Sequence, residues 1–208
     1  MAASDFFTNF HLFVRWVHVF FGIVWVGHLY FLNFVNLQLQ GALDDAGKKI
    51  VNPKLMPRVL WWFRWGAMVT FLAGWVLFTM SYMYTPGVGF GPSAMFSDGA
   101  GLTQRAIWIL LGMTLGTIMW FNVWFVIWPT QRRILSGQVP AEELPAARAR
   151  AALFSRVNTF LSGPMLYGML GAAHYTAINA FTVIVFVALG VWPIWHAYGI
   201  SKKVGLSV

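Results

Sequence analysis

Long apolar blocks, separated by polar loops, restrict the fold of this chain more than any other feature. The blocks cover about residues 11–37, 60–83, 107–128 and 157–197. A helix rises 1.5 Å per residue and a bilayer core is about 30 Å thick, so about 20 apolar residues make one span. As a single helix the last block would reach about 60 Å, and we expect it to fold back near residues 174–179. Five spans are therefore predicted, at about residues 11–37, 60–83, 105–128, 155–174 and 177–198.

The composition supports a membrane protein. Of the 208 residues, 59% are hydrophobic and 10% are charged, whereas a soluble domain has roughly 25% charged residues. The predicted fold class is all-α, an integral membrane helix bundle that forms a single transmembrane domain over residues 1–208 in a lipid bilayer. The net charge of +8 comes from loops between the apolar blocks, so we expect no nucleic-acid binding.

The positive charges predict the orientation of the bundle. Arg15 and Arg105 fall on one side of the five predicted spans, and the other twelve Lys and Arg residues fall on the opposite side. Those twelve are Lys48, Lys49, Lys54, Arg58, Arg64, Arg132, Arg133, Arg148, Arg150, Arg156, Lys202 and Lys203. Short basic loops stay in the cytoplasm. The N-terminus is therefore predicted outside and the C-terminus in the cytoplasm, in a multi-pass protein of a bacterial inner membrane.

Five histidines lie in or beside the apolar blocks: His11, His18, His28, His174 and His196. An imidazole at membrane depth is costly unless it has a partner, and haem iron suits a neutral imidazole in a helix bundle. The chain has no cysteine, which excludes covalent c-type haem and thiolate-bound iron–sulfur clusters within these residues. The predicted cofactor is one or two non-covalent haem b groups.

Depth in the membrane divides the histidines into two sets. His18 and His174 are predicted as axial iron ligands at an outer site, and His28 and His196 as ligands at an inner site. The ten-residue spacing of His18 and His28 is about 15 Å along a helix, too far for one haem. Arg15 and Arg105 could pair with haem propionates outside, and Arg64 inside. The alternative is structural: interfacial histidines and arginines that snorkel to the membrane surface.

No catalytic constellation is evident, since all six carboxylates lie in loops or the N-terminal tail: Asp5, Asp44, Asp45, Asp98, Glu142 and Glu143. A proton pump or a cation-coupled transporter is therefore not expected. The Gly- and Pro-rich stretch 85–101 predicts an irregular external loop, and residues 140–150 predict a short cytoplasmic helix. Gly112 and Gly116 form a packing motif that predicts a close neighbour for the third span.

Scattered motifs carry a family resemblance. They are Arg15-Trp-Val-His18, Gly22-Ile-Val-Trp-Val-Gly27, Tyr30-Phe31, Trp62-Phe-Arg-Trp65, Gly74, Gly116-Thr-Ile-Met119, Asn122-Val123, Ile127-Trp-Pro-Thr-Gln-Arg132, Asn158, Pro164 and His174-Tyr175. With these motifs the chain resembles the membrane domain of bacterial urate oxidases fused to cytochrome c, also called urate hydroxylases. The resemblance implies a multi-span bundle that faces a periplasmic cytochrome c, with His18 and His174 as the matching histidines. Trp108 and Val157 stand where the family pattern has further histidines.

Three functions follow as hypotheses. The first is a haem b-binding electron-transfer subunit that links a membrane partner or quinone to an external cytochrome c. The second is a structural or accessory subunit of a large respiratory or photosynthetic membrane complex, which the small size and aromatic surface favour. The third, a membrane component of a urate or purine oxidase, rests on the resemblance. Other membrane subunits are expected partners in each case.

Overall fold

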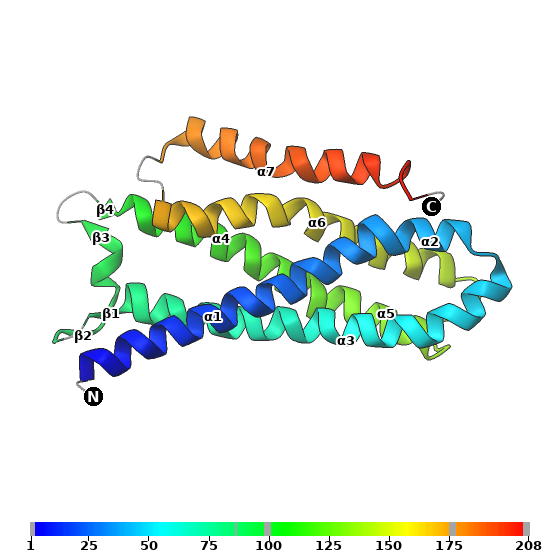
Figure 1. The fold of residues 1–208 in the computed structure, drawn as a ribbon, viewed down its shortest axis with the longest axis horizontal. Coiled ribbons are helices and arrows are strands. Elements are labelled where there is room, and N and C mark those ends of the chain that lie inside the picture. Colours follow the sequence, from blue (N-terminus) through cyan, green and yellow to red (C-terminus); the bar gives the residue numbers. More distant parts are fainter. Residues whose placement is uncertain (1–2, 86, 98–100, 175–177, 206–208) are drawn as a thin grey trace.

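The computed structural model describes residues 3–85, 87–97, 101–174 and 178–205, most of them in helices that follow one long axis (Figure 1). The long helices are α1 (Ala3–Tyr30), α3 (Asp45–Phe78), α4 (Gln104–Phe121), α6 (Leu144–His174) and α7 (Ala180–Ile200). The N-terminus and all short strands lie at one end of the bundle, here called the hairpin end, and the C-terminus lies at the other (Figure 1). The helical bundle expected from the sequence is confirmed.

Within the described residues, four helical segments have the length and apolarity of a membrane span: Asp5–Ala42, Asp45–Met83, Gln104–Leu135 and Ala180–Ile200. Helix α6, the predicted fourth span, is 31 residues long but carries Arg148, Arg150 and Arg156 in its first half. It packs against α4 and α7. The three arginines are exposed, whereas the polar residues Asn158, Thr159 and Ser162 are buried between α6 and its neighbours.

Three of the helices run beyond their apolar blocks. Helix α1 continues through a π-helical stretch, η1 (Phe31–Asn36), into α2 (Leu37–Ala42). Helix α3 begins at Asp45, about 15 residues before the predicted span, and ends in η2 (Thr79–Met83). Helix α4 continues through η4 (Asn122–Ile127) into α5 (Trp128–Leu135). These extensions are more polar than the apolar blocks and contain Pro53 and Pro57 of α3, so hydropathy marks the spans but not the helix ends.

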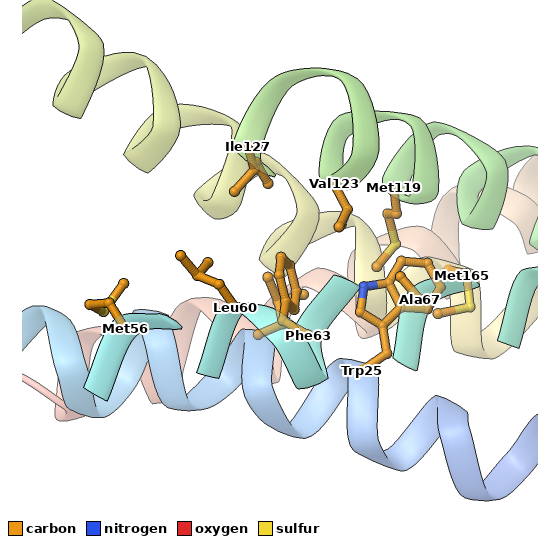
Figure 2. Close-up of a cluster of buried hydrophobic side chains, with 10 residues drawn as sticks. Trp25, Met56, Leu60, Phe63, Ala67, Met119, Val123, Ile127 and Met165 are labelled. Carbon is orange, nitrogen blue, oxygen red and sulfur yellow. The ribbon is translucent and has the colours of Figure 1, made fainter. Parts of the chain in front are cut away.

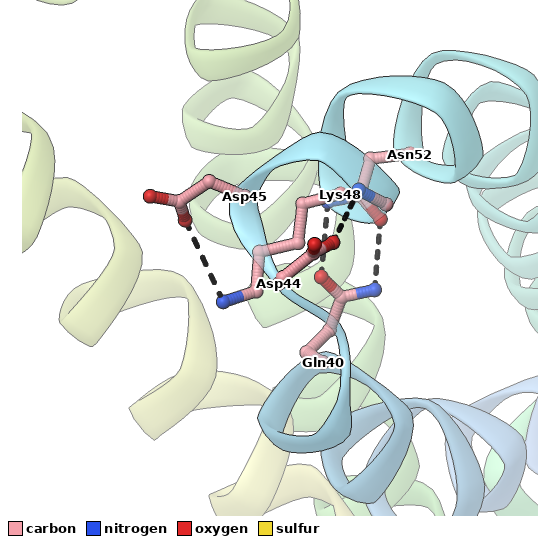
Figure 3. Close-up of polar contacts among 6 residues, drawn as sticks. Gln40, Asp44, Asp45, Lys48 and Asn52 are labelled. Atoms are coloured by element: carbon pink, nitrogen blue, oxygen red, sulfur yellow. Dashed lines mark hydrogen bonds and ion pairs between the residues drawn. The ribbon is translucent and has the colours of Figure 1, made fainter.

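Polar contacts stabilise the turn between α2 and α3 (Figure 3). The Asp44 carboxylate caps α3 by accepting a hydrogen bond from the Gly47 amide at 2.7 Å. The side-chain amides of Gln40 and Asn52 form two reciprocal hydrogen bonds of 2.7 and 2.9 Å across the turn. Because each amide donates to and accepts from the other, neither leaves a polar group unpaired as the chain reverses.

Two predictions for the loops are wrong. The stretch 85–101, predicted to be irregular, contains two antiparallel strand pairs: β1 (Tyr84–Thr85) with β2 (Gly89–Phe90), and β3 (Phe96–Ser97) with β4 (Gly101–Leu102). A 3₁₀ turn, η3 (Pro92–Met95), joins the two pairs. Gly87 and Gly89 adopt positive φ angles of 83° and 106°, which glycine tolerates in such tight turns. The separate helix predicted at 140–150 is instead the first part of α6, which begins at Leu144.

The core lies where α1, α3, α4 with η4, and α6 meet (Figure 2). Trp25 and Leu29 come from α1, and Phe63 and Ala67 from α3, all of them almost fully buried. Met119, Val123, Ile127 and Met165 close the cluster from the other side. Helices α1 and α3 approach closely at Gly66, where an added Cβ would lie 3.1 Å from the backbone nitrogen of Trp25.

Glycines also bring α6 against α4 and α7. A Cβ on Gly112 of α4 would lie 2.8 Å from the backbone nitrogen of Met169 of α6. A Cβ on Gly163 of α6 would lie 2.0 Å from the carbonyl oxygen of Gly190 of α7. The close neighbour predicted from Gly112 and Gly116 is therefore confirmed, and it is α6. Small residues permit this backbone contact between membrane helices.

Candidate functional site

A cavity of about 560 Å³ lies between α1, α3, α4 and α6. Its size falls within the roughly 300–1,000 Å³ typical of ligand pockets. The lining is almost entirely apolar, and His18 is its one titratable imidazole among the described residues. Exposed apolar side chains of α1 and α6 form part of its rim: Ile23 is 68% exposed and Leu170 is 58% exposed. The cavity therefore opens on the side of the bundle, through an apolar surface.

One hydrogen bond orients the His18 ring. Its Nδ1 lies 2.9 Å from the backbone carbonyl oxygen of Thr70 on α3. A carbonyl can only accept, so Nδ1–H donates and the neutral ring keeps its lone pair on Nε2. A backbone carbonyl that fixes the tautomer in this way is the usual second partner of a histidine that ligates a metal. His18 is thus prepared to offer one nitrogen to a ligand.

Small residues make space around this imidazole. A Cβ on Gly74 would lie 3.0 Å from Cε1 of His18 and 3.2 Å from its Nδ1. The ring therefore rests on the backbone of α3, and a larger residue at position 74 would displace it. Gly22, Gly27 and Gly116 also line the cavity, which widens it enough for a flat group to approach the helix backbones.

Three methionines line the same cavity: Met113 of α4, and Met165 and Met169 of α6. The side chains of Met165 and Met169 both come within 3.8 Å of the position that a Cβ of Gly116 would take. Thioethers are established axial ligands of haem when histidine is the other ligand. The sequence interpretation missed this group, although the four-residue spacing of Met165 and Met169 places both on one face of a helix.

His174, the predicted partner of His18, lies elsewhere. It is the last residue of α6, is exposed, and is absent from the described lining of the cavity. It follows the rim residue Leu170 by one turn, about 6 Å along the axis. Gly171, just under one turn before His174, packs against Trp108, with 2.8 Å between a Cβ there and the Trp108 ring. The indole of Trp108 also contacts Phe186 of α7 and so fills the space between α4, α6 and α7.

The two histidines of the predicted inner site lie on different helices. The His28 Nδ1–H donates to the Val24 carbonyl of its own helix at 2.7 Å. His196 of α7 is exposed and stacks on Trp192, with 5.9 Å between ring centroids. Neither ring is among the described residues that line the large cavity. An inner haem site between them remains a prediction.

The predicted outer cations meet at the hairpin end. The Arg105 Nε–H donates to the Tyr82 hydroxyl at 3.1 Å, and the Nε2 of His11 lies 3.1 Å from the Ser81 hydroxyl. Arg15 and Arg105 both lie close enough to His11 to act on its imidazole electrostatically. Both cations thus lie near His11, and their pairing with haem propionates remains a prediction.

No group of three or more His, Cys, Asp or Glu side chains in the described part of the chain could hold a metal ion on its own. The cavity instead offers one imidazole and several thioethers, with glycines beside them. This set of donors matches a metal that already has four ligands from a macrocycle. The residues present therefore fit haem b through His18.

Comparison with known proteins gives one family. The family model described as urate oxidase N-terminal matches residues 90–203, slightly more than half of the chain. No curated protein matches the chain, and no solved structure does.

Proposed function

The chain belongs to the urate oxidase N-terminal family, and from that premise we propose that it is a haem b-binding electron-transfer subunit of a bacterial inner membrane. In this role it links a membrane partner or quinone to an external cytochrome c. The observation that carries the proposal is the orientation of His18, whose Nδ1–H is bound by Thr70 while the ring lines an apolar cavity. When bound, haem b supplies a one-electron couple between ferric and ferrous iron.

Several residues of the chain would hold haem b, each in a different way. His18 would offer Nε2 to the iron, and the Thr70 carbonyl would keep the ring in the required tautomer and direction. A thioether of Met113, Met165 or Met169, which line the same cavity, would help to hold the iron in place of His174. The apolar walls exclude water, which favours the less charged ferrous state and raises the reduction potential, as a methionine ligand also does.

The absorption spectrum of the purified chain tests this proposal. Expressed with an ample haem supply, the chain is expected to show a Soret band and reducible α and β bands, with about one haem b per polypeptide by pyridine haemochrome assay. The chain has no cysteine, so acid acetone should extract all of the pigment. Fully folded protein without any haem absorbance would contradict the proposal and favour an accessory subunit.

A second candidate function is that of a membrane component of a urate or purine oxidase. The description of the family, urate oxidase N-terminal, is the observation that favours it. We expect membranes that contain the chain and its partners to consume oxygen, or reduce cytochrome c, when urate is added. The matched control is the same membrane with His18→Ala. Equal rates with and without the chain would contradict this candidate and leave the electron-transfer role untouched.

A further inference from the structure

Arg64 is a cation of α3 surrounded by indole rings. Its Cζ lies 3.9 Å from the ring centroid of Trp128, 5.7 Å from that of Trp65 and 5.8 Å from that of Trp124. The Trp124 indole N–H also donates to the Arg64 carbonyl at 3.2 Å. Guanidinium groups stack readily on aromatic faces, and this stacking fixes the direction of the hydrogen-bond donors. Arg64 is therefore held in place rather than free to move into solvent.

The charge of Arg64 is uncompensated in the described part of the chain. Its Nε is buried and has no hydrogen-bond partner there, and no described carboxylate forms an ion pair with it. The charged group that acts on it is Arg132 of α5, which has the same sign. A cation that has an unpaired buried donor, and a second cation near enough to repel it, is unfavourable unless an anion joins the two.

The predicted span at residues 60–83 places Arg64 near a membrane boundary. Nineteen residues separate Arg64 from Met83 at the hairpin end of the same helical segment, about 28 Å at 1.5 Å per residue, close to the thickness of the hydrocarbon layer. Exposed tryptophans surround Arg64 on α3, namely Trp61, Trp62 and Trp65. Tryptophan gathers at the level of lipid headgroups, which is where phosphate groups lie.

We propose that Arg64 and Arg132 bind the phosphate of an anionic phospholipid, whose acyl chains lie against the tryptophans. A guanidinium presents parallel N–H donors that match two phosphate oxygens. Basic pockets between membrane helices bind anionic headgroups in the same manner. This site is independent of haem, because it shares no residue with the lining of the large cavity.

Native mass spectrometry of the full chain in nanodiscs tests the site. The lipid probes are phosphatidylglycerol and phosphatidylcholine, and inorganic phosphate is the aqueous probe. We expect the chain to retain phosphatidylglycerol in preference to phosphatidylcholine. Arg64→Gln should weaken this retention by on the order of fivefold, the scale of one basic residue near a charged surface. Arg64→Lys should retain an intermediate amount of phosphatidylglycerol, because lysine keeps the charge but lacks the parallel N–H donors of the guanidinium.

Arg58→Gln is the matched control, because Arg58 lies on the same helix, is exposed, and hydrogen-bonds the Lys54 carbonyl. It should retain phosphatidylglycerol within about twofold of the parent chain. If Arg64→Gln fails to fold, Arg132→Gln carries the same expectation. Equal retention of both lipids, or no effect of either arginine variant, would overturn the proposal. Displacement of the lipid by millimolar inorganic phosphate would also overturn it, because the site would then be one for a soluble anion.

Discussion

His18→Ala is expected to abolish the haem b absorbance of the purified chain. The substitution removes the one imidazole of the cavity and the nitrogen that would ligate iron. The remaining thioethers bind haem iron weakly without a histidine opposite them. The helix itself should persist, since alanine is the best helix former and the lost hydrogen bond to Thr70 is worth only about 1 kcal/mol. Absorbance per polypeptide, measured beside the circular dichroism of the same sample, checks this result.

Companion variants separate ligation from structure. His28→Ala should keep the haem, because His28 lies outside the cavity and is bound to its own helix. His174→Ala should keep it as well if a methionine is the second ligand, and leucine at one of the three methionine positions should then lower the reduction potential. Added imidazole should restore the spectrum of His18→Gly, since the cavity admits the free ligand. A full haem complement in His18→Ala would refute the assignment of this ligand.

Gly163→Val is expected to separate α7 from the rest of the bundle. A Cβ at position 163 would lie 2.0 Å from the carbonyl oxygen of Gly190 and 2.6 Å from its carbonyl carbon. Both partners are backbone atoms, so no side-chain rotation relieves the overlap and the helices must move apart. Overpacking in cores costs typically 1–3 kcal/mol, and we expect at least the upper part of that range. Thermal unfolding in detergent should show a lower melting temperature and earlier proteolysis of residues 178–205.

Gly199→Val serves as the control for this effect. Gly199 lies on α7, the helix that Gly163 of α6 contacts, and a Cβ there meets nothing within 4 Å. The two variants share the change in hydrophobicity and in helix propensity and differ in the contact between α6 and α7. Equal melting temperatures for the two would show that the α6–α7 contact contributes little to stability.

The sequence predicted the parts of this structure that depend on composition along the chain. The helical segments and their approximate centres follow from apolar blocks, because hydrocarbon length sets the number of residues in a span. The helix ends could not be predicted in the same way. Polar turns such as those around Asp45 and Leu135 continue a helix, but they lie outside the apolar blocks and give no hydropathy signal. The short strands of the hairpin end were also missed, because two-residue strands leave no periodic pattern.

The candidate site was predicted in part. The depth of His18 follows from counting residues, and its presence in a cavity agrees with that count. Its contact with Thr70 and Gly74 depends on how α1 is rotated and shifted against α3, which depth does not determine. The pairing with His174 was inferred from depth and from the family resemblance, whereas the methionines of α6 line the cavity. The rotation and shift of one helix against another are set by how their side chains pack, which sequence position alone does not give.

The apolar rim at Ile23 and Leu170 affects how any occupant reaches the cavity. Entry through the side of a bilayer makes the membrane itself the reservoir, so occupancy follows the mole fraction of a molecule among the lipids rather than its aqueous concentration. Excess detergent would lower the mole fraction of the occupant and therefore the occupancy of the cavity, although the contacts between occupant and protein would be unchanged. A lipophilic inhibitor should accordingly lose potency in proportion to added lipid, while its intrinsic affinity stays the same.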